Sequence, residues 1–259
     1  MNKEDWGNIM ELFGTMKVEE NELIIGGNRA TDLVKEYGSP LYVFDEELIR
    51  NYCRDYRKYF KCEENNNKVA FAGKAFLNVQ MCKLLKEENM NLDVVSGGEL
   101  YTAYKADFPL EKVMFHGNNK TLDEIELGVK LGVGKFVVYN FYEMEALNNI
   151  AKEYNKVQNI YLRITPGIDA HTHEYIRTGQ IDSKFGFAPV EDTIEKSIEM
   201  AINLENINLV GIHCHIGSQT FGLEAYEEAV EVMFNLVKKI KKNMDYLIKE
   251  VDFGGGFGI

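Results

Sequence analysis

Short apolar runs alternate with longer amphipathic stretches along most of this chain. The longer stretches, such as 122–131, 143–154 and 226–248, are charged and long enough for helices. Strands that alternate with helices are typical of βα units, so the sequence predicts a mainly parallel sheet covered by helices. The runs expected to form strands are 41–44, 68–72, 92–95, 112–115, 135–139, 159–164, 208–213 and 246–253.

Residues that can do chemistry gather at the ends of these runs. Lys74, Asp93 and Arg163 lie at or just beyond three of them. In a (β/α)8 barrel the carboxyl ends of all strands form one face, where active sites lie. An open doubly wound sheet uses mainly its switch point, so reactive groups at nearly every end favour the barrel. The histidines at or after such ends are His116, His171, His173, His213 and His215.

Composition excludes several other classes of protein. A chain of 259 residues without a low-complexity linker suits one barrel or two smaller domains, and its net charge of −12 argues against a nucleic-acid or anionic membrane surface. No apolar run approaches the roughly 20 residues of a spanning helix, and the N-terminus has no secretory pattern. The cysteines lack CxxC pairing, which favours a cytoplasmic protein with free thiols: Cys53, Cys62, Cys82 and Cys214.

Two strand ends carry the features of a site for a flat, phosphorylated cofactor. At 212–219 an imidazole, a glycine and a hydroxyl arrive together, which offers a ring to stack, a close backbone approach and a phosphate donor. At 251–258, Gly254, Gly255 and Gly256 leave backbone N–H groups free to surround an anion. The alternative is a zinc pair formed by His213 and His215, or buried histidines satisfied by hydrogen bonds, although their i, i+2 spacing is a weak metal signal.

Lys74 adds a nucleophile to the same predicted face. It leaves an apolar strand beside Gly73 and Ala75, where partial desolvation would lower the pKa of its amine and favour Schiff-base formation. The alternative is an ordinary surface lysine at a strand end. A lysine, a stacking ring and a phosphate nest together indicate pyridoxal 5'-phosphate as the cofactor.

Several motifs then resemble, in order, those of alanine-racemase-like pyridoxal phosphate enzymes, and in particular their decarboxylase branch. The segment 169–180, continued at 182–186, is similar to that of the diaminopimelate decarboxylase family. The resemblance runs from about residue 39 to the last residue. The motifs that carry it are 71–75, 116–120, 163–167, 213–219 and 254–258.

The resemblance implies roles for particular residues. Lys74 would hold the cofactor covalently and help to reprotonate the product carbon, and His215 would stack on the cofactor ring. Ser218 and the three glycines would bind the phosphate, and no metal is implied. Further pocket residues, for which strand-end salt bridges or helix caps are an equal alternative, would be Asp93, Glu99 and Arg163.

The implied reaction is the decarboxylation of meso-2,6-diaminopimelate to L-lysine and CO₂, the last step of lysine biosynthesis, by a homodimer in the full-length enzyme. Alternatives are a decarboxylase of ornithine, arginine or carboxynorspermidine, or a non-catalytic cofactor-binding remnant. Residues 1–37 would belong to a β domain and 38–259 to the barrel. The predicted strands from Lys68 onward number seven, so we expect an incomplete (β/α)8 barrel and a truncated chain that is poorly active by itself.

Overall fold

The structure is a computed structural model that describes residues 11–61, 67–167 and 185–258. Contacts divide the chain into two compact units. One comprises Met1–Val69 with Leu84–Met90, and the other Ala70–Lys83 with Asn91–Ile259. The assignment of residues 1–37 to a β domain, and of 38–259 to the barrel, stays a prediction.

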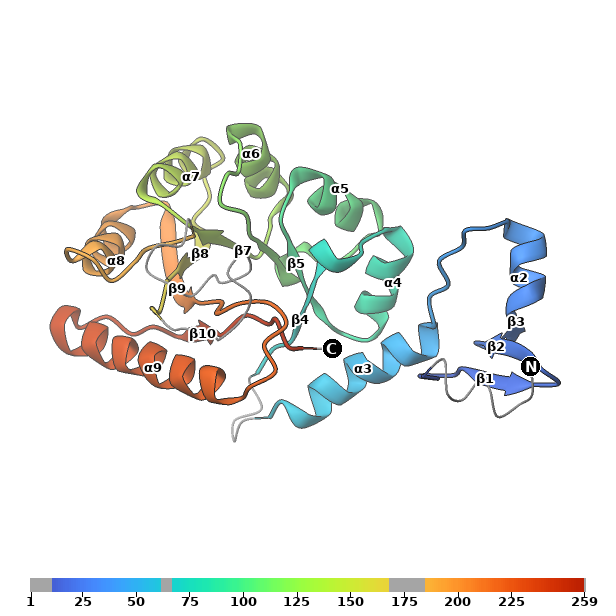
Figure 1. Ribbon diagram of the computed structural model, residues 1–259. Helices are drawn as coiled ribbons and strands as arrows, with labels where there is room; N and C mark the ends of the chain where they lie inside the picture. The colour runs from blue at the N-terminus through green and yellow to red at the C-terminus, as the bar shows by residue number, and fades with distance from the viewer. Residues whose placement is uncertain (1–10, 62–66, 168–184, 259) are drawn as a thin grey trace. The chain divides into compact units, whose positions relative to one another are not determined.

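The larger unit contains a seven-stranded sheet in which every neighbouring pair is parallel. Its order, β10-β9-β8-β7-β6-β5-β4, follows the chain without a jump, and the strands curl as part of a barrel (Figure 1). The predicted incomplete (β/α)8 barrel is confirmed. The strands are β4 Ala70–Ala72, β5 Asn91–Val94, β6 Val113–Phe115, β7 Lys135–Val138, β8 Gln158–Arg163, β9 Ile207–His213 and β10 Glu250–Asp252.

Helices follow the strands, as the alternating pattern predicted, and they lie along the outer side of the curled sheet (Figure 1). The expected helix at 122–131 is found with the same bounds. The α-helices of this part of the chain are α4 Val79–Glu87, α5 Gly97–Lys105, α6 Leu122–Leu131, α7 Phe141–Glu153, α8 Thr193–Asn203 and α9 Glu224–Met244. Two short 3₁₀ helices, η1 and η2, cover Gly73–Ala75 and Leu110–Lys112.

Capping residues start several of these helices soon after a strand ends. The side chains of Ser96, Thr121 and Asn140 each accept a hydrogen bond from a backbone N–H in the first turn of α5, α6 and α7, respectively. Such caps satisfy donors that a helix start would otherwise leave open. Helix and sheet also pack closely, because a Cβ at Gly128 of α6 would lie 2.4 Å from the Phe136 ring of β7.

The two faces of the sheet differ in chemistry. Side chains alternate along a strand, so Leu92 and Val94 of β5 are fully buried on one face while Asp93 lies on the other. On β6 the partner of Asp93 is Met114, but farther along the sheet the register places polar side chains next to each other. They are Arg163 of β8, His213 of β9 and Asp252 of β10. Charged and imidazole groups therefore lie at the carboxyl ends of the strands, the face where barrel active sites are found.

The smaller unit begins with the three-stranded antiparallel sheet β1 Lys17–Glu19, β2 Glu22–Ile25 and β3 Asn28–Arg29, then α2 Ala30–Tyr37 and α3 Glu46–Tyr59. The strand predicted at 41–44 is wrong. Its four side chains are exposed, Tyr42 by 90%, and no ladder partner is found for it among the described residues. Without pairing and burial, an apolar β-prone run does not become a strand.

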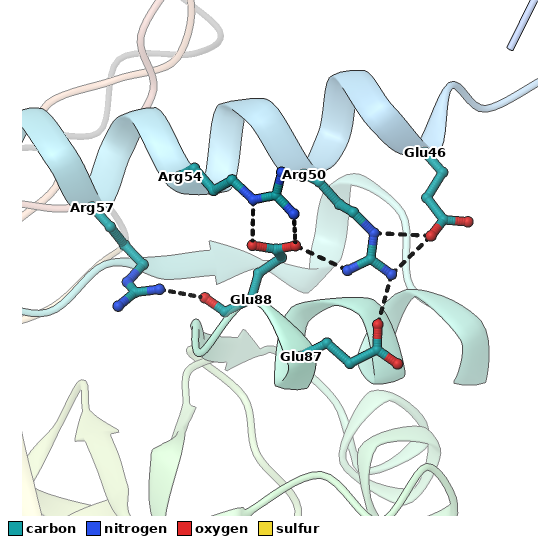
Figure 2. Close-up of polar contacts among 6 residues, drawn as sticks. All are labelled: Glu46, Arg50, Arg54, Arg57, Glu87 and Glu88. Carbon is teal, nitrogen blue, oxygen red and sulfur yellow. Dashed lines mark hydrogen bonds and ion pairs between the residues drawn. The ribbon is translucent and has the colours of Figure 1, made fainter.

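A network of ion pairs joins α3 to the end of α4 within this smaller unit (Figure 2). Arg54 binds both carboxylate oxygens of Glu88, at 3.0 and 2.7 Å. Arg50 donates to Glu46, Glu87 and Glu88, and Arg57 donates to the backbone carbonyl of Glu88 at 3.0 Å. The three arginines lie on one side of α3, so helical spacing alone aligns them with the acidic end of α4.

Candidate active site

Three residues in register on β8, β9 and β10 form the centre of the inner polar face. Arg163 pairs with His213, and His213 pairs with Asp252. Arg163 and His213 are buried, and the Arg163 guanidinium donates from Nη1 to Nδ1 of His213 at 3.4 Å. A guanidinium can only donate, so the neutral His213 ring carries its proton on Nε2. Asp252 Oδ1 accepts from the backbone N–H of Gly254 at 2.8 Å, which fixes the turn after β10.

His116, just after β6, extends this cluster toward β5 and β7. Its ring meets that of His213 edge-on, with centroids 4.7 Å apart. His116 Nε2 lies 3.8 Å from Asp93 Oδ1, and Nδ1 lies 3.3 Å from the Tyr139 hydroxyl. The ends of six consecutive strands, β5 to β10, therefore converge on one polar cluster.

Burial controls the protonation of this cluster. It raises the pKa of Asp93 well above its usual range, and the charge of Asp252 adds to that effect. Burial, followed by the charge of Arg163, lowers the pKa of His116 and of His213 well below 6.5. The same causes, with a contribution from Lys74, lower the pKa of His215 to about 3. The three imidazoles are therefore neutral at neutral pH.

Lys74 lies on η1, directly after β4. A Cβ at Gly73 would lie 2.8 Å from the Asp93 carbonyl oxygen, so the glycine allows η1 to approach β5 closely. The positive charge of Lys74 contributes to the pKa shifts of both Asp93 and His215, after larger effects of burial. The side chain is exposed, so the structure does not show the partial desolvation that the sequence suggested.

The loops after β9 and β10 are joined to each other. Thr220 N donates to the Gly256 carbonyl at 2.9 Å, and Gly258 N donates to the Thr220 carbonyl at 3.0 Å. This pairing brings the loop that contains Ser218 beside the three predicted glycines. Gly256 has φ +94°, and a Cβ there would lie 1.9 Å from the Gly217 carbonyl oxygen, so no other residue fits.

His215 lies against the same glycines. A Cβ at Gly254, whose φ is +70°, would lie 2.9 Å from His215 Nδ1. At Gly255 a Cβ would meet no atom within 4 Å, so this residue borders open space. His215 and the glycine-rich backbone thus lie together, and the loop that contains Ser218 lies beside them. Glu99 accepts from Val95 N at 2.7 Å, which is the helix-start contact given above as its alternative role.

The sequence alone predicts no role for Tyr139 and Asp252 of this cluster. It marks His116 and His213 only as strand-end histidines, the second also in the alternative zinc pair. The common signal of these four residues is position, because each lies on or just after a strand and faces the inner side of the sheet. That signal becomes readable only once the register between strands is known. The segment 169–180, including His171, His173 and Arg177, lies outside the described residues.

A metal ion is disfavoured in the same place. His116, His213 and Asp252 offer ligand atoms that lie within 4.8 Å of one another. However, the Arg163 guanidinium already hydrogen-bonds His213 Nδ1, and its positive charge opposes that of a cation. The predicted alternative of a zinc pair from His213 and His215 is not the combination that clusters among the described side chains.

The residues present do fit pyridoxal phosphate. Two buried polar atoms of the described chain, Asp93 Oδ1 and Thr220 Oγ1, have no hydrogen-bond partner, and such atoms normally mark a place where another group binds. They accompany a glycine cradle, a neutral imidazole, a guanidinium and an amine. Fold and site together define a barrel-type binding domain for a flat, anionic cofactor.

Comparison with known families agrees with this class. Residues 46–259 match the family described as pyridoxal-dependent decarboxylase, pyridoxal binding domain. The chain belongs to this family, whose cofactor is pyridoxal phosphate.

The similar proteins include diaminopimelate decarboxylases. That of Bacillus methanolicus is 46% identical over 96% of this chain and 58% of its own length, and that of Bacillus subtilis is 44% identical over 96% and 57%. A crystal structure of the M. jannaschii enzyme with L-lysine is 36% identical, with a TM-score of 0.87 over 95% of this chain and 57% of its own. The chain thus spans somewhat more than half the length of these relatives. In the part that the structure describes, we find no helix with the length and apolar character of a membrane span.

Proposed function

We propose that this chain is the pyridoxal phosphate-binding part of a diaminopimelate decarboxylase, which converts meso-2,6-diaminopimelate to L-lysine and CO₂. The observation that carries the proposal is the joined pair of loops after β9 and β10, which brings the segment of His215 and Ser218 next to the glycines 254–256. The proposed substrate follows the relatives, whose names specify diaminopimelate at 38–46% identity over most of this chain.

In this proposal the protein binds and orients the cofactor. The N–H groups of Gly255 and Gly256 and the Ser218 hydroxyl hold the phosphate, since backbone donors curled around an anion make a strong site. His215 packs against the ring as a neutral imidazole, consistent with the lowered pKa of its side chain. Asp93 and Arg163 line the pocket between the phosphate site and Lys74.

Bound pyridoxal phosphate supplies a conjugated ring that accepts the electron pair left when the bond to CO₂ breaks. Lys74 would hold the cofactor through its ε-nitrogen, and its ammonium would return a proton to the carbon that loses the carboxylate. The neutral imidazoles around it compete weakly for that proton. By the same family membership we propose a cytoplasmic homodimer.

A trapping experiment tests the site. Borohydride reduction of the chain in the presence of pyridoxal phosphate, followed by peptide mapping, should place the adduct on Lys74 and not on Lys239, an exposed lysine that serves as the internal control. K74A should lose the adduct. An adduct spread over surface lysines, equal in wild type and K74A, would contradict the proposed site.

An activity assay tests the reaction. Lysine formation from meso-2,6-diaminopimelate is measured with this chain alone and with it co-expressed with the segment of the Bacillus methanolicus relative that the match does not cover. We expect lysine from the co-expressed pair, none from the K74A pair, and little from this chain alone. Product from ornithine or arginine instead would support the related decarboxylases. A trapped adduct with no turnover on any of these substrates would favour a non-catalytic binding role.

A further inference from the structure

Lys120 is an almost completely buried cation with every donor in use. Its side chain is 1% exposed. Nζ donates to the Gly117 carbonyl at 2.7 Å, to the Val137 carbonyl at 2.9 Å and to Glu143 Oε1 at 2.6 Å. An ammonium has three N–H donors, so these contacts leave none for solvent or ligand. Lys120 therefore acts only through the groups that it holds.

Glu143 is fixed as firmly as its partner. Its side chain is 5% exposed, and the oxygen not used by Lys120, Oε2, accepts from the backbone N–H of Tyr139 at 3.0 Å. Its own backbone N–H donates to the Asn140 side chain that caps α7. Glu143 therefore links the buried ammonium to the point where β7 ends and α7 begins.

Lys120 and Glu143 each bind a residue that adjoins or contacts His116. The carbonyl that Lys120 binds belongs to Gly117, the next residue, whose φ of +111° turns the loop sharply. The residue that Glu143 binds is Tyr139, whose hydroxyl lies 3.3 Å from His116 Nδ1. The His116 ring is thus held from its backbone side and from its Nδ1 side, and Nε2 is left directed toward Asp93.

A purely structural role explains this pair poorly. Burying two charges has a large desolvation penalty, and well-packed apolar residues of similar volume often serve stability as well or better. Apolar side chains cannot make the three hydrogen bonds that this pair makes to backbone groups beside the active-site cluster. These groups are the carbonyls of Gly117 and Val137 and the N–H of Tyr139. Directionality toward His116 is therefore the property that the pair adds.

We propose that Lys120, together with Glu143, is a positioning residue that fixes the orientation of His116 in the cofactor pocket. The role of the pocket rests on the proposed function, whereas the orientation of His116 is a property of this chain alone. Two separate measurements can therefore distinguish a failure of one from a failure of the other.

The experiment uses the 259-residue chain with ¹³C-labelled histidine. The His116 signal is assigned by its loss in H116N, and its chemical shift is recorded in wild type, K120M and Y139F. Y139F removes only the hydroxyl at His116 Nδ1, so it remains informative if K120M does not fold. K239M, which removes an exposed lysine paired with Glu195 on the surface, is the matched control. Pyridoxal phosphate affinity is measured on the same samples by absorbance titration.

We expect the His116 signal to move in K120M and Y139F and to stay in place in K239M, and the cofactor Kd to rise about ten-fold in K120M, equivalent to ~1.4 kcal/mol. An unmoved His116 signal in the folded variants would overturn the positioning role. A moved signal with unchanged cofactor affinity would overturn its link to the pocket. If wild type itself bound no cofactor, the proposed function would fail, and the His116 shift would still decide the positioning role.

Discussion

The chain contains two ion-pair networks of similar composition and opposite setting. Lys120 and Glu143 are isolated from solvent, with side chains 1% and 5% exposed. In the network of α3 and α4, Arg50 and Arg54 are 20% and 58% exposed and share one carboxylate, that of Glu88 (Figure 2). Both members of the buried pair also bind backbone groups, whereas most contacts of the arginine network join side chains, and only its Glu88 carboxylate is buried.

The pKa shifts show which effect dominates in each setting. Hydrogen bonding to Arg54 is the largest cause at Glu88, and the pKa of that carboxyl is lowered below 4.5. At Lys120 burial is the largest cause, and it lowers the pKa of the ammonium although Glu143 acts in the opposite direction. At Glu88, although its carboxylate is buried, the hydrogen bonds from Arg54 prevail over desolvation, whereas at Lys120 desolvation prevails over the attraction of Glu143. Directed partners inside the protein therefore contribute geometry more than stability.

The largest effect should come from breaking the buried pair. K120M leaves the Glu143 carboxylate buried without its cation, and we expect the free energy of unfolding to fall by about 3–5 kcal/mol. The double variant K120M/E143L removes both charges and should recover most of that loss. Urea unfolding followed by circular dichroism measures both variants. A double variant as unstable as K120M would mean that the pair itself, and not the unpaired charge, supplies the stability.

A smaller effect should come from the arginine network. R50A removes contacts to three carboxylates. Two of them are largely exposed, and buried Glu88 keeps its bidentate contact with Arg54, so we expect a loss of about 1 kcal/mol. A smaller loss is expected for the more exposed Arg54 in R54A. Sodium chloride at ~1 M should shrink both losses by screening but leave that of K120M nearly unchanged. If salt reduced the loss of unfolding free energy equally in R50A, R54A and K120M, the proposed difference in solvent screening between the two networks would be wrong.

The smallest effect should be a change in acid sensitivity. The pKa of Glu88 is lower in the folded chain than its ordinary value of 4.5, so its stabilising contribution is complete above about pH 4.5 and is lost as the pH falls through the lowered value. In E88Q the part of the acid-induced loss of unfolding free energy that comes from Glu88 should be absent. The remaining pH dependence of the unfolding free energy should be unchanged. Unfolding free energies measured between about pH 3 and 6 test this, and parallel profiles for wild type and E88Q would contradict it.

The fold was predictable because its signal is local. Apolar runs such as 92–95 and 135–139 become buried strands, and Thr121 with Glu124 marks the start of α6 as a capping box. The run 41–44 has the same local signal but gains neither a partner strand nor burial in the described structure. A pattern of side chains specifies a strand only when another element is available to cover it.

The candidate site was predictable where its residues lie in contiguous motifs, as with His215, Ser218 and the glycines. It was not predictable where contacts join distant segments. Tyr139 and His116 are 23 residues apart, and so are Lys120 and Glu143. Their meeting depends on the register of β6 against β7 and on the start of α7, which sequence alone does not set to within one residue.

The two hydrogen bonds between Thr220 and the loop after β10 also have a thermodynamic consequence. β10 is the last strand in the sheet order and pairs with β9. A ligand that contacts both loops would hold β10 in place in addition to its pairing with β9. Its binding free energy would therefore add to the free energy of local opening of β10. Occupancy of the phosphate site and slow amide exchange in residues 250–252 would then be two measures of one equilibrium.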